Sequence, residues 1–168
     1  DGIVYKGILY AGLMIDSNGN PYVVEFNIRF GDPETQIVLP KLKTDLVDIF
    51  MAIQSNQLCN MCIEWDDNYS VCVVMAAEGY PGSYKKGAEI IGLNHSSDSN
   101  SWVVQAGTKL SDSGTYLTNG GRVLTVCAQG DTLSSAIQSA YKRCESIRFD
   151  GAYYRKDIGQ KGLLRLAV

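Results

Sequence analysis

The chain has 168 residues, of which 45% are hydrophobic and 20% are charged, so it has the composition of an ordinary globular protein. Its formal net charge of -3 provides no broad basic surface, and general binding to nucleic acid is therefore not expected. No apolar run is long enough to cross a bilayer, and the first residues lack a signal-peptide pattern. The five cysteines are an odd number at irregular positions, which is typical of reduced thiols. We expect a cytoplasmic protein with no membrane partner.

The N-terminal part of the chain predicts a β-hairpin followed by a helix. Residues 9–15 are mostly apolar, residues 17–20 form a turn signal, and residues 22–28 alternate between polar and apolar side chains. After a loop, apolar side chains recur with helical spacing over residues 42–53. This order indicates two antiparallel strands and one amphipathic helix.

The rest of the chain predicts a small α+β unit that begins near residues 64–68. Its strongest helix signal covers residues 133–147, where apolar side chains return every three or four positions. The polar segment 94–100, which holds the only histidine, His95, is expected to be an exposed loop. Short apolar runs bounded by turn residues predict strands at residues 71–77, 89–93, 102–106 and 122–128.

The second strand of the predicted hairpin carries an alternation of chemical interest. If its two-residue period continues, Glu25, Asn27 and Arg29 share one face. A carboxylate and an amide oxygen two residues apart can bind one Mg²⁺ ion, and a guanidinium beside them suits a phosphate or carboxylate. The pattern suggests phosphoryl chemistry, although a strand facing water is also ordinarily polar.

Six blocks of the sequence, which occur in the same order, resemble the C-terminal portion of the glycinamide ribonucleotide synthetases, also called phosphoribosylamine–glycine ligases. This family of purine biosynthesis belongs to the ATP-grasp enzymes, and the similarity runs essentially from end to end. The matching blocks are Gly7 to Met14, Glu25 to Gln36, Gly79 to Gly82, Ala106 to Lys109, Thr118 to Val123 and Tyr154 to Gly159.

The resemblance implies a fold, a reaction and a set of site residues. The expected fold is α+β, with the C-terminal part of an ATP-grasp fold (an antiparallel hairpin plus a helix) followed by a small α+β domain. The implied reaction joins glycine to 5-phosphoribosylamine through glycyl phosphate, while ATP becomes ADP and phosphate. By position in the motif, Glu25 and Asn27 match metal ligands for Mg²⁺ or Mn²⁺, and Arg29 matches the group that faces the transferring phosphoryl. Asp32 and Glu34 are implied to recognise glycine or the phosphoribosylamine.

The second unit offers a candidate site for the 5-phosphate of the substrate, formed by Lys109, Gly120 and Arg122. Glycines let backbone N–H groups approach an anion, and the two cations supply positive charge. The simpler interpretation is a hairpin turn with a solvated arginine, and the sequence leaves both open.

We expect residues 1–65 to be the C-terminal part of the catalytic domain and residues 66–168 to be the small C-terminal domain. On this interpretation the chain is a fragment that has no ligase activity without the N-terminal portion of the enzyme. Two alternatives remain at this point, namely a fragment of another ATP-grasp carboxylase or ligase and a non-catalytic module that binds a metabolite. An exposed apolar face on the hairpin would favour a part of a larger enzyme.

Overall fold

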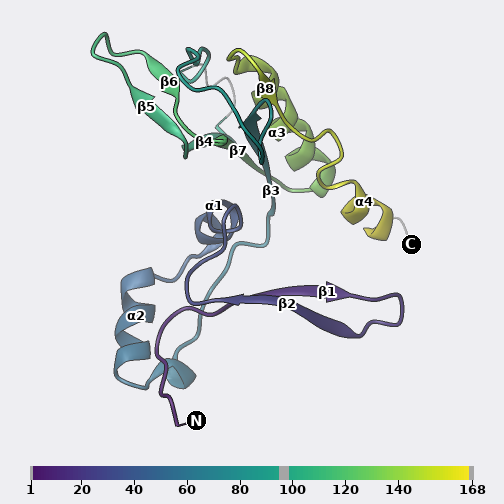
Figure 1. Cartoon of the computed structure of the whole chain (residues 1–168). Coiled ribbons are helices and arrows are strands. Elements are labelled where there is room, and N and C mark those ends of the chain that lie inside the picture. Colours follow the sequence, from purple (N-terminus) through teal and green to yellow (C-terminus); the bar gives the residue numbers. More distant parts are fainter. Residues whose placement is uncertain (1, 95–98, 167–168) are drawn as a thin grey trace. The chain divides into compact units, whose positions relative to one another are not determined.

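The computed structural model describes residues 2–94 and 99–166 and consists of two compact units, Asp1–Asp66 and Asp67–Val168, which are described separately (Figure 1). Most of the loop predicted at residues 94–100, including His95, lies outside the described residues. None of the described helices is both long enough and apolar enough to cross a bilayer.

The predicted hairpin is confirmed in the first unit. Strands β1 (Tyr10–Ile15) and β2 (Pro21–Asn27) pair antiparallel and form a two-stranded sheet. Asp16 organises the turn, because its carboxylate accepts hydrogen bonds from the backbone N–H groups of Asn18 at 2.8 Å and Asn20 at 2.9 Å. The Asn20 side chain also donates to it, and these hydrogen bonds hold the pKa of Asp16 below its usual value.

The predicted amphipathic helix forms, but it begins later than expected. Asp45 caps it, since its side chain accepts a hydrogen bond from the Val47 N–H at 2.7 Å. Leu42 therefore lies before the helix, where it forms an isolated β-bridge with Trp65. The helical segments of this unit are α1 (Thr35–Val38), η1 (Leu39–Lys41), α2 (Leu46–Gln54) and η2 (Leu58–Asn60).

The second unit is built on an antiparallel sheet in which the strands follow the order β4-β7-β3-β8. The strand predicted at residues 89–93 is wrong, because this segment makes only isolated bridges, Glu89 with Leu117 and Ile91 with Arg148. A short hairpin of β5 and β6, which the sequence did not predict, extends from the sheet (Figure 1). The strands are β3 (Tyr69–Ala77), β4 (Ser101–Gln105), β5 (Thr108–Leu110), β6 (Tyr116–Thr118), β7 (Arg122–Gly130) and β8 (Ala152–Tyr153).

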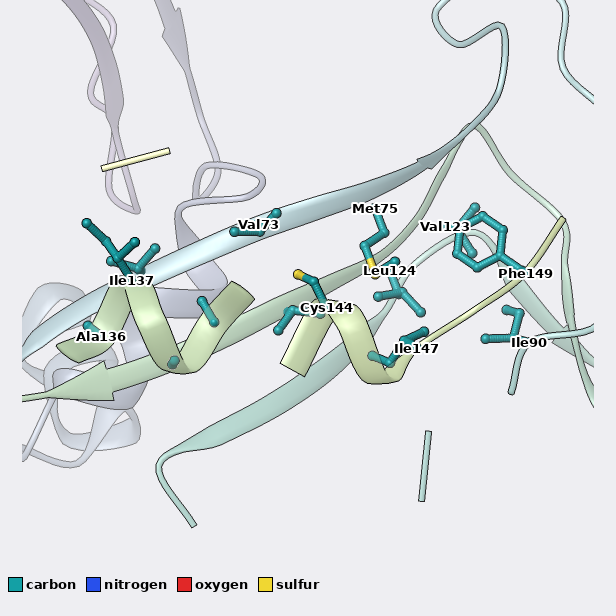
Figure 2. Close-up of a cluster of buried hydrophobic side chains, with 14 of the residues drawn as sticks. Val73, Met75, Ile90, Val123, Leu124, Ala136, Ile137, Cys144, Ile147 and Phe149 are labelled. Carbon is teal, nitrogen blue, oxygen red and sulfur yellow. The ribbon is translucent and has the colours of Figure 1, made fainter. Parts of the chain in front are cut away.

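The hydrophobic core of this unit lies between the sheet and α3 (Leu133–Ser146), which packs against β3 and β7 (Figure 2). Thr132 caps the helix in a reciprocal capping box with Ser135. Apolar side chains at helical spacing then point from α3 into the sheet, which explains why its sequence signal was clear. The core residues labelled in Figure 2 are Val73, Met75, Ile90, Val123, Leu124, Ala136, Ile137, Cys144, Ile147 and Phe149.

Two polar side chains of α3 tie flanking segments to the helix. The Arg143 guanidinium is buried and donates hydrogen bonds to the carbonyl oxygens of Gly92 at 2.9 Å and Leu93 at 2.6 Å. The Tyr141 hydroxyl donates to the Arg155 carbonyl at 2.9 Å and accepts from the Ile158 N–H at 3.0 Å. The chain then continues into α4 (Gln160–Leu166), a short helix that was not predicted.

Truncation of a core leucine should destabilise the second unit strongly. Leu124 is fully buried, so Leu124→Ala should lower the free energy of unfolding by about 2–5 kcal/mol through lost transfer energy and a cavity. Leu110→Ala is the matched control, because Leu110 is 60% exposed and its truncation should change little. Urea unfolding followed by circular dichroism checks this, and equal effects of the two substitutions would contradict the described core.

The cysteines should differ sharply in reactivity. Burial raises the pKa values of the Cys127 and Cys144 thiols to about 12, so both stay protonated at about pH 8, where only a thiolate reacts readily. Cys59 and Cys62 are free and exposed. Iodoacetamide should therefore modify Cys59 and Cys62 first, as followed by peptide mass spectrometry. All four should react in denaturant, and rapid labelling of Cys144 in the native chain would refute its burial.

Candidate functional site

The first candidate site lies on one face of the β1–β2 hairpin, where the pairing register brings its polar residues together. Glu25 pairs with Gly12 and Asn27 pairs with Tyr10, and directly opposed residues project to the same side of a sheet. A register shift between Gly12 and Leu13 leaves Val24 without a partner, as in a β-bulge. Glu25, Asn27 and Tyr10 therefore share one face.

Gly12 makes room for the carboxylate side chain on this face. A Cβ atom at Gly12 would lie 3.1 Å from Cγ of Glu25, which is tighter than ordinary contact. The Glu25 side chain therefore lies against the backbone of β1. The absence of a side chain at Gly12 therefore leaves room for the Glu25 side chain on this face.

Arg29 is not part of the strand, contrary to the prediction. Strand β2 ends at Asn27, which pairs with Tyr10, the first residue of β1. The Arg29 guanidinium is exposed and donates a hydrogen bond to the Phe30 carbonyl at 2.8 Å. Its position depends on the loop after β2 and not on the pleat of the strand.

The loop after β2 returns to the hairpin face through Glu34. The Tyr10 hydroxyl donates a hydrogen bond to Oε1 of Glu34 at 3.1 Å. This hydrogen bond and the charge of Glu34 raise the pKa of Tyr10, with a smaller contribution in the same direction from Glu25, whereas Arg29 lowers it. The phenol of Tyr10 therefore lies in the field of three of the predicted site residues.

Asp32 lies in the turn that leads into α1. Its Oδ1 accepts a hydrogen bond from the Gln36 side-chain amide at 2.9 Å. The Thr35 hydroxyl and N–H both donate to the Gly31 carbonyl, which closes the turn. Asp32 thus contributes to the helix entry, and its implied role in substrate recognition stays a prediction.

The donors on the hairpin face fit a hard divalent cation. Within the described residues, no group of three or more His, Cys, Asp or Glu side chains gathers around one point. The candidate metal ligands on this face are the Glu25 carboxylate and the Asn27 amide. The Nδ2 atom of Asn27 is buried and has no hydrogen-bond partner in the part of the chain that the structure describes. Because amide O and N positions are interchangeable by a flip, this side chain is free to present its oxygen to a ligand. Mg²⁺ commonly takes only one or two protein ligands and completes its shell with phosphate and water.

The second candidate site lies in the other unit, and its residues come from separate elements. Lys109 is exposed on β5 opposite Leu117, and Arg122 begins β7 opposite Ala76. Gly120 packs backbone to backbone on Gly107, since a Cβ at Gly120 would lie 2.8 Å from the Gly107 Cα. The glycine therefore has a packing role, and a phosphate site formed by Lys109, Gly120 and Arg122 stays a prediction.

Tyr10 is the site residue that sequence reasoning missed. Counting back from the turn without a bulge pairs Tyr10 with Phe26, on the opposite face from Glu25 and Asn27. The observed pairing of Tyr10 with Asn27 depends on the extra residue Val24. No local signal in the sequence marks that bulge.

The chain is similar to known proteins of one family. A model of the phosphoribosylglycinamide synthetase C domain matches residues 70–161, and a model of the ATP-grasp (A) domain of the same synthetase matches residues 1–35. A phosphoribosylamine–glycine ligase from Caldanaerobacter subterraneus is 52% identical over 94% of this chain, and the chain spans 37% of that relative.

Two solved structures resemble the chain. The phosphoribosylamine–glycine ligase from Thermotoga maritima is 35% identical and has a TM-score of 0.72, with 89% of this chain and 36% of that chain covered. The biotin carboxylase domain of 2-oxoglutarate carboxylase from Hydrogenobacter thermophilus, solved with magnesium ADP and bicarbonate, is 17% identical with a TM-score of 0.60. The match covers 88% of this chain and 35% of that chain, and at this identity it shows a shared fold alone.

The fold and the acidic hairpin therefore define an ATP-grasp protein of α+β architecture. Within that class, the chain belongs to the phosphoribosylglycinamide synthetase family. The family assignment agrees with the resemblance seen in the sequence and favours it over a fragment of a carboxylase.

Proposed function

We propose that this chain forms part of a ligase that joins glycine to 5-phosphoribosylamine in purine (IMP) biosynthesis and gives glycinamide ribonucleotide. Membership of the synthetase family supports the reaction class. The single observation that carries the assignment to residues is the shared hairpin face of Glu25 and Asn27. The catalytic role belongs to the complete protein, because the chain spans only 37% of the curated relative named above.

The proposed chemistry has two steps. A carboxylate oxygen of glycine attacks the γ-phosphorus of ATP, ADP leaves, and glycyl phosphate forms. The amine of 5-phosphoribosylamine then attacks the carbonyl carbon, phosphate leaves, and the new amide nitrogen loses a proton. In transfers of this type the protein mainly positions groups and neutralises charge.

Glu25 and Asn27 would hold the divalent metal, Mg²⁺ or Mn²⁺, that such a reaction uses with ATP. The metal supplies charge neutralisation on the phosphates when bound. Glu25 contributes a negative carboxylate on a side chain for which Gly12 leaves room, and Asn27 contributes an amide whose Nδ2 atom has no hydrogen-bond partner in the described chain. These two side chains orient one end of the nucleotide.

Arg29 would stabilise the negative charge that develops on the transferring phosphoryl group. Its guanidinium is exposed and is engaged by one backbone carbonyl, so its other donors remain accessible to an anion. Asp32 and Glu34, both acceptors in the loop that follows, would bind the ammonium of glycine or the amine and hydroxyls of the phosphoribosylamine. Lys109, Gly120 and Arg122 would bind its 5-phosphate.

The exposed apolar surface of the hairpin supports a larger catalytic domain. Val24 and Phe26 on β2 are 66% and 60% exposed and Ile28, just after the strand, is 75% exposed, although large apolar side chains that lie together are normally covered. We assign residues 1–65 to the C-terminal part of the ATP-grasp catalytic domain and residues 66–168 to the small C-terminal domain. The N-terminal portion of the same enzyme would cover the hairpin, and the chain alone should lack ligase activity. We place the reaction in the cytoplasm, where the five free cysteines stay reduced.

Substitution of the acidic ligand should abolish most turnover of the complete protein. Glu25→Gln keeps the shape of the side chain but removes the charge that binds the metal, so kcat/KM should fall about 100-fold or more. Asn27→Ala should act in the same direction. The control is Glu64→Gln, at an exposed glutamate of the same unit outside the site. ADP release that depends on glycine and phosphoribosylamine measures this, and full turnover in Glu25→Gln would refute the metal assignment.

The phosphate site makes a separate prediction. In the complete protein, Arg122→Ala and Lys109→Ala should raise KM for 5-phosphoribosylamine about tenfold, because each removes one charge-assisted contact to its phosphate. The KM values for ATP and glycine should change little. Lys142→Ala, at an exposed lysine of α3, is the control. Unchanged KM for 5-phosphoribosylamine in both variants would reduce Gly120 and Arg122 to a turn and a solvated cation.

A further inference from the structure

The Tyr10 side chain joins the two parts of the hairpin site. Tyr10 lies on β1 directly opposite Asn27, and its hydroxyl reaches across to Oε1 of Glu34, 24 residues further along the chain. Glu34 comes from the loop after β2, outside the sheet.

Gly31 provides the space in which Tyr10 and Glu34 meet. Gly31 is buried, and a Cβ atom there would lie 2.9 Å from Cε2 of Tyr10 and would overlap the Glu34 carboxylate. Real Cβ atoms do not approach other atoms so closely, so both side chains pack against the bare backbone of this residue. The contact between Tyr10 and Glu34 is therefore held on two sides, by a hydrogen bond and by the glycine surface.

The loop that carries Glu34 has little else to fix its carboxylate. Its backbone starts α1, in which the Ile37 and Val38 N–H groups donate to the Glu34 carbonyl at 3.1 and 2.9 Å. Those bonds hold the main chain but leave the side chain to rotate. The Tyr10 hydroxyl is what selects one orientation of the carboxylate.

We propose that Tyr10 is a positioning residue that holds the Glu34 carboxylate over the face formed by Glu25 and Asn27. This proposal rests on the proposed function only in naming the substrate group that Glu34 receives, the ammonium of glycine or the amine and hydroxyls of 5-phosphoribosylamine. Tyr10 acts through Glu34 and does not itself contact substrate. Its loss should weaken binding of that one substrate and leave ATP binding unchanged.

The test uses a double-mutant cycle in the complete protein. Tyr10→Phe keeps the ring against Gly31 and removes only the hydroxyl, so KM for the substrate bound by Glu34 should rise about 3- to 10-fold, with KM for ATP unchanged. Glu34→Ala should raise the same KM. In the Glu34→Ala background, Tyr10→Phe should add less than about twofold, because the two residues act as one unit. Tyr22→Phe, at an exposed tyrosine on the same hairpin, is the matched control.

A second measurement does not depend on turnover. Hydrogen exchange at the Thr35, Ile37 and Val38 amides should accelerate in Tyr10→Phe and not in Tyr22→Phe, because the loop loses its tie to β1. The proposal is overturned if exchange and KM stay at wild-type values in Tyr10→Phe. It is also overturned if the effects of Tyr10→Phe and Glu34→Ala simply add. If the wild-type complete protein shows no ligase activity, the proposed function fails, and the exchange comparison alone decides whether Tyr10 holds the loop.

Discussion

One extra residue in β2, Val24, determines which side chains can act together on the hairpin. Because the side-chain period of a strand is two, an insertion of one residue moves every later side chain to the other face. Glu25 and Asn27, which follow the bulge in the chain, therefore lie on the same face as Tyr10 and Gly12. On β1, Gly12 lies opposite Glu25, and Tyr10, with its large side chain, lies opposite Asn27. The whole arrangement of donors follows from this register.

The second unit depends on a different constraint, the burial of one face of its sheet under α3. The central strands β3 and β7 carry the fully buried side chains, such as Met75 and Leu124, and α3 covers them. The same helix anchors two irregular segments through Arg143 and Tyr141. Arg122 begins β7, a central strand of this layer, and Lys109 lies on β5 of the short hairpin that precedes it.

The sequence predicted the elements with strong periodicity and failed where pairing partners decide the outcome. The hairpin and α3 were predicted because alternation and helical spacing are local signals. Residues 89–93 resemble a strand, yet they find only single bridges at Glu89 and Ile91, so no ladder forms. The hairpin β5–β6 was missed because each strand has three residues, too few for a visible period.

The same limit applies to the candidate site. Glu25 and Asn27 could be placed on one face from the sequence, because the two lie after the bulge. Arg29 could not, since β2 ends at Asn27. The role of Tyr10 could not be predicted, because its neighbour across the sheet depends on the bulge and its hydrogen bond to Glu34 joins residues far apart in the chain. Long-range register is information that a single sequence does not carry locally.

The two-stranded sheet of the first unit has a further physical consequence. A lone hairpin is marginal in water, and both outer edges of β1 and β2 present backbone groups beside exposed apolar side chains. Such an edge is a template for strand addition by another copy. When it is not covered, the hairpin that carries the donor atoms is also the segment through which this chain would aggregate, so solubility and the integrity of the site depend on the same covering contacts.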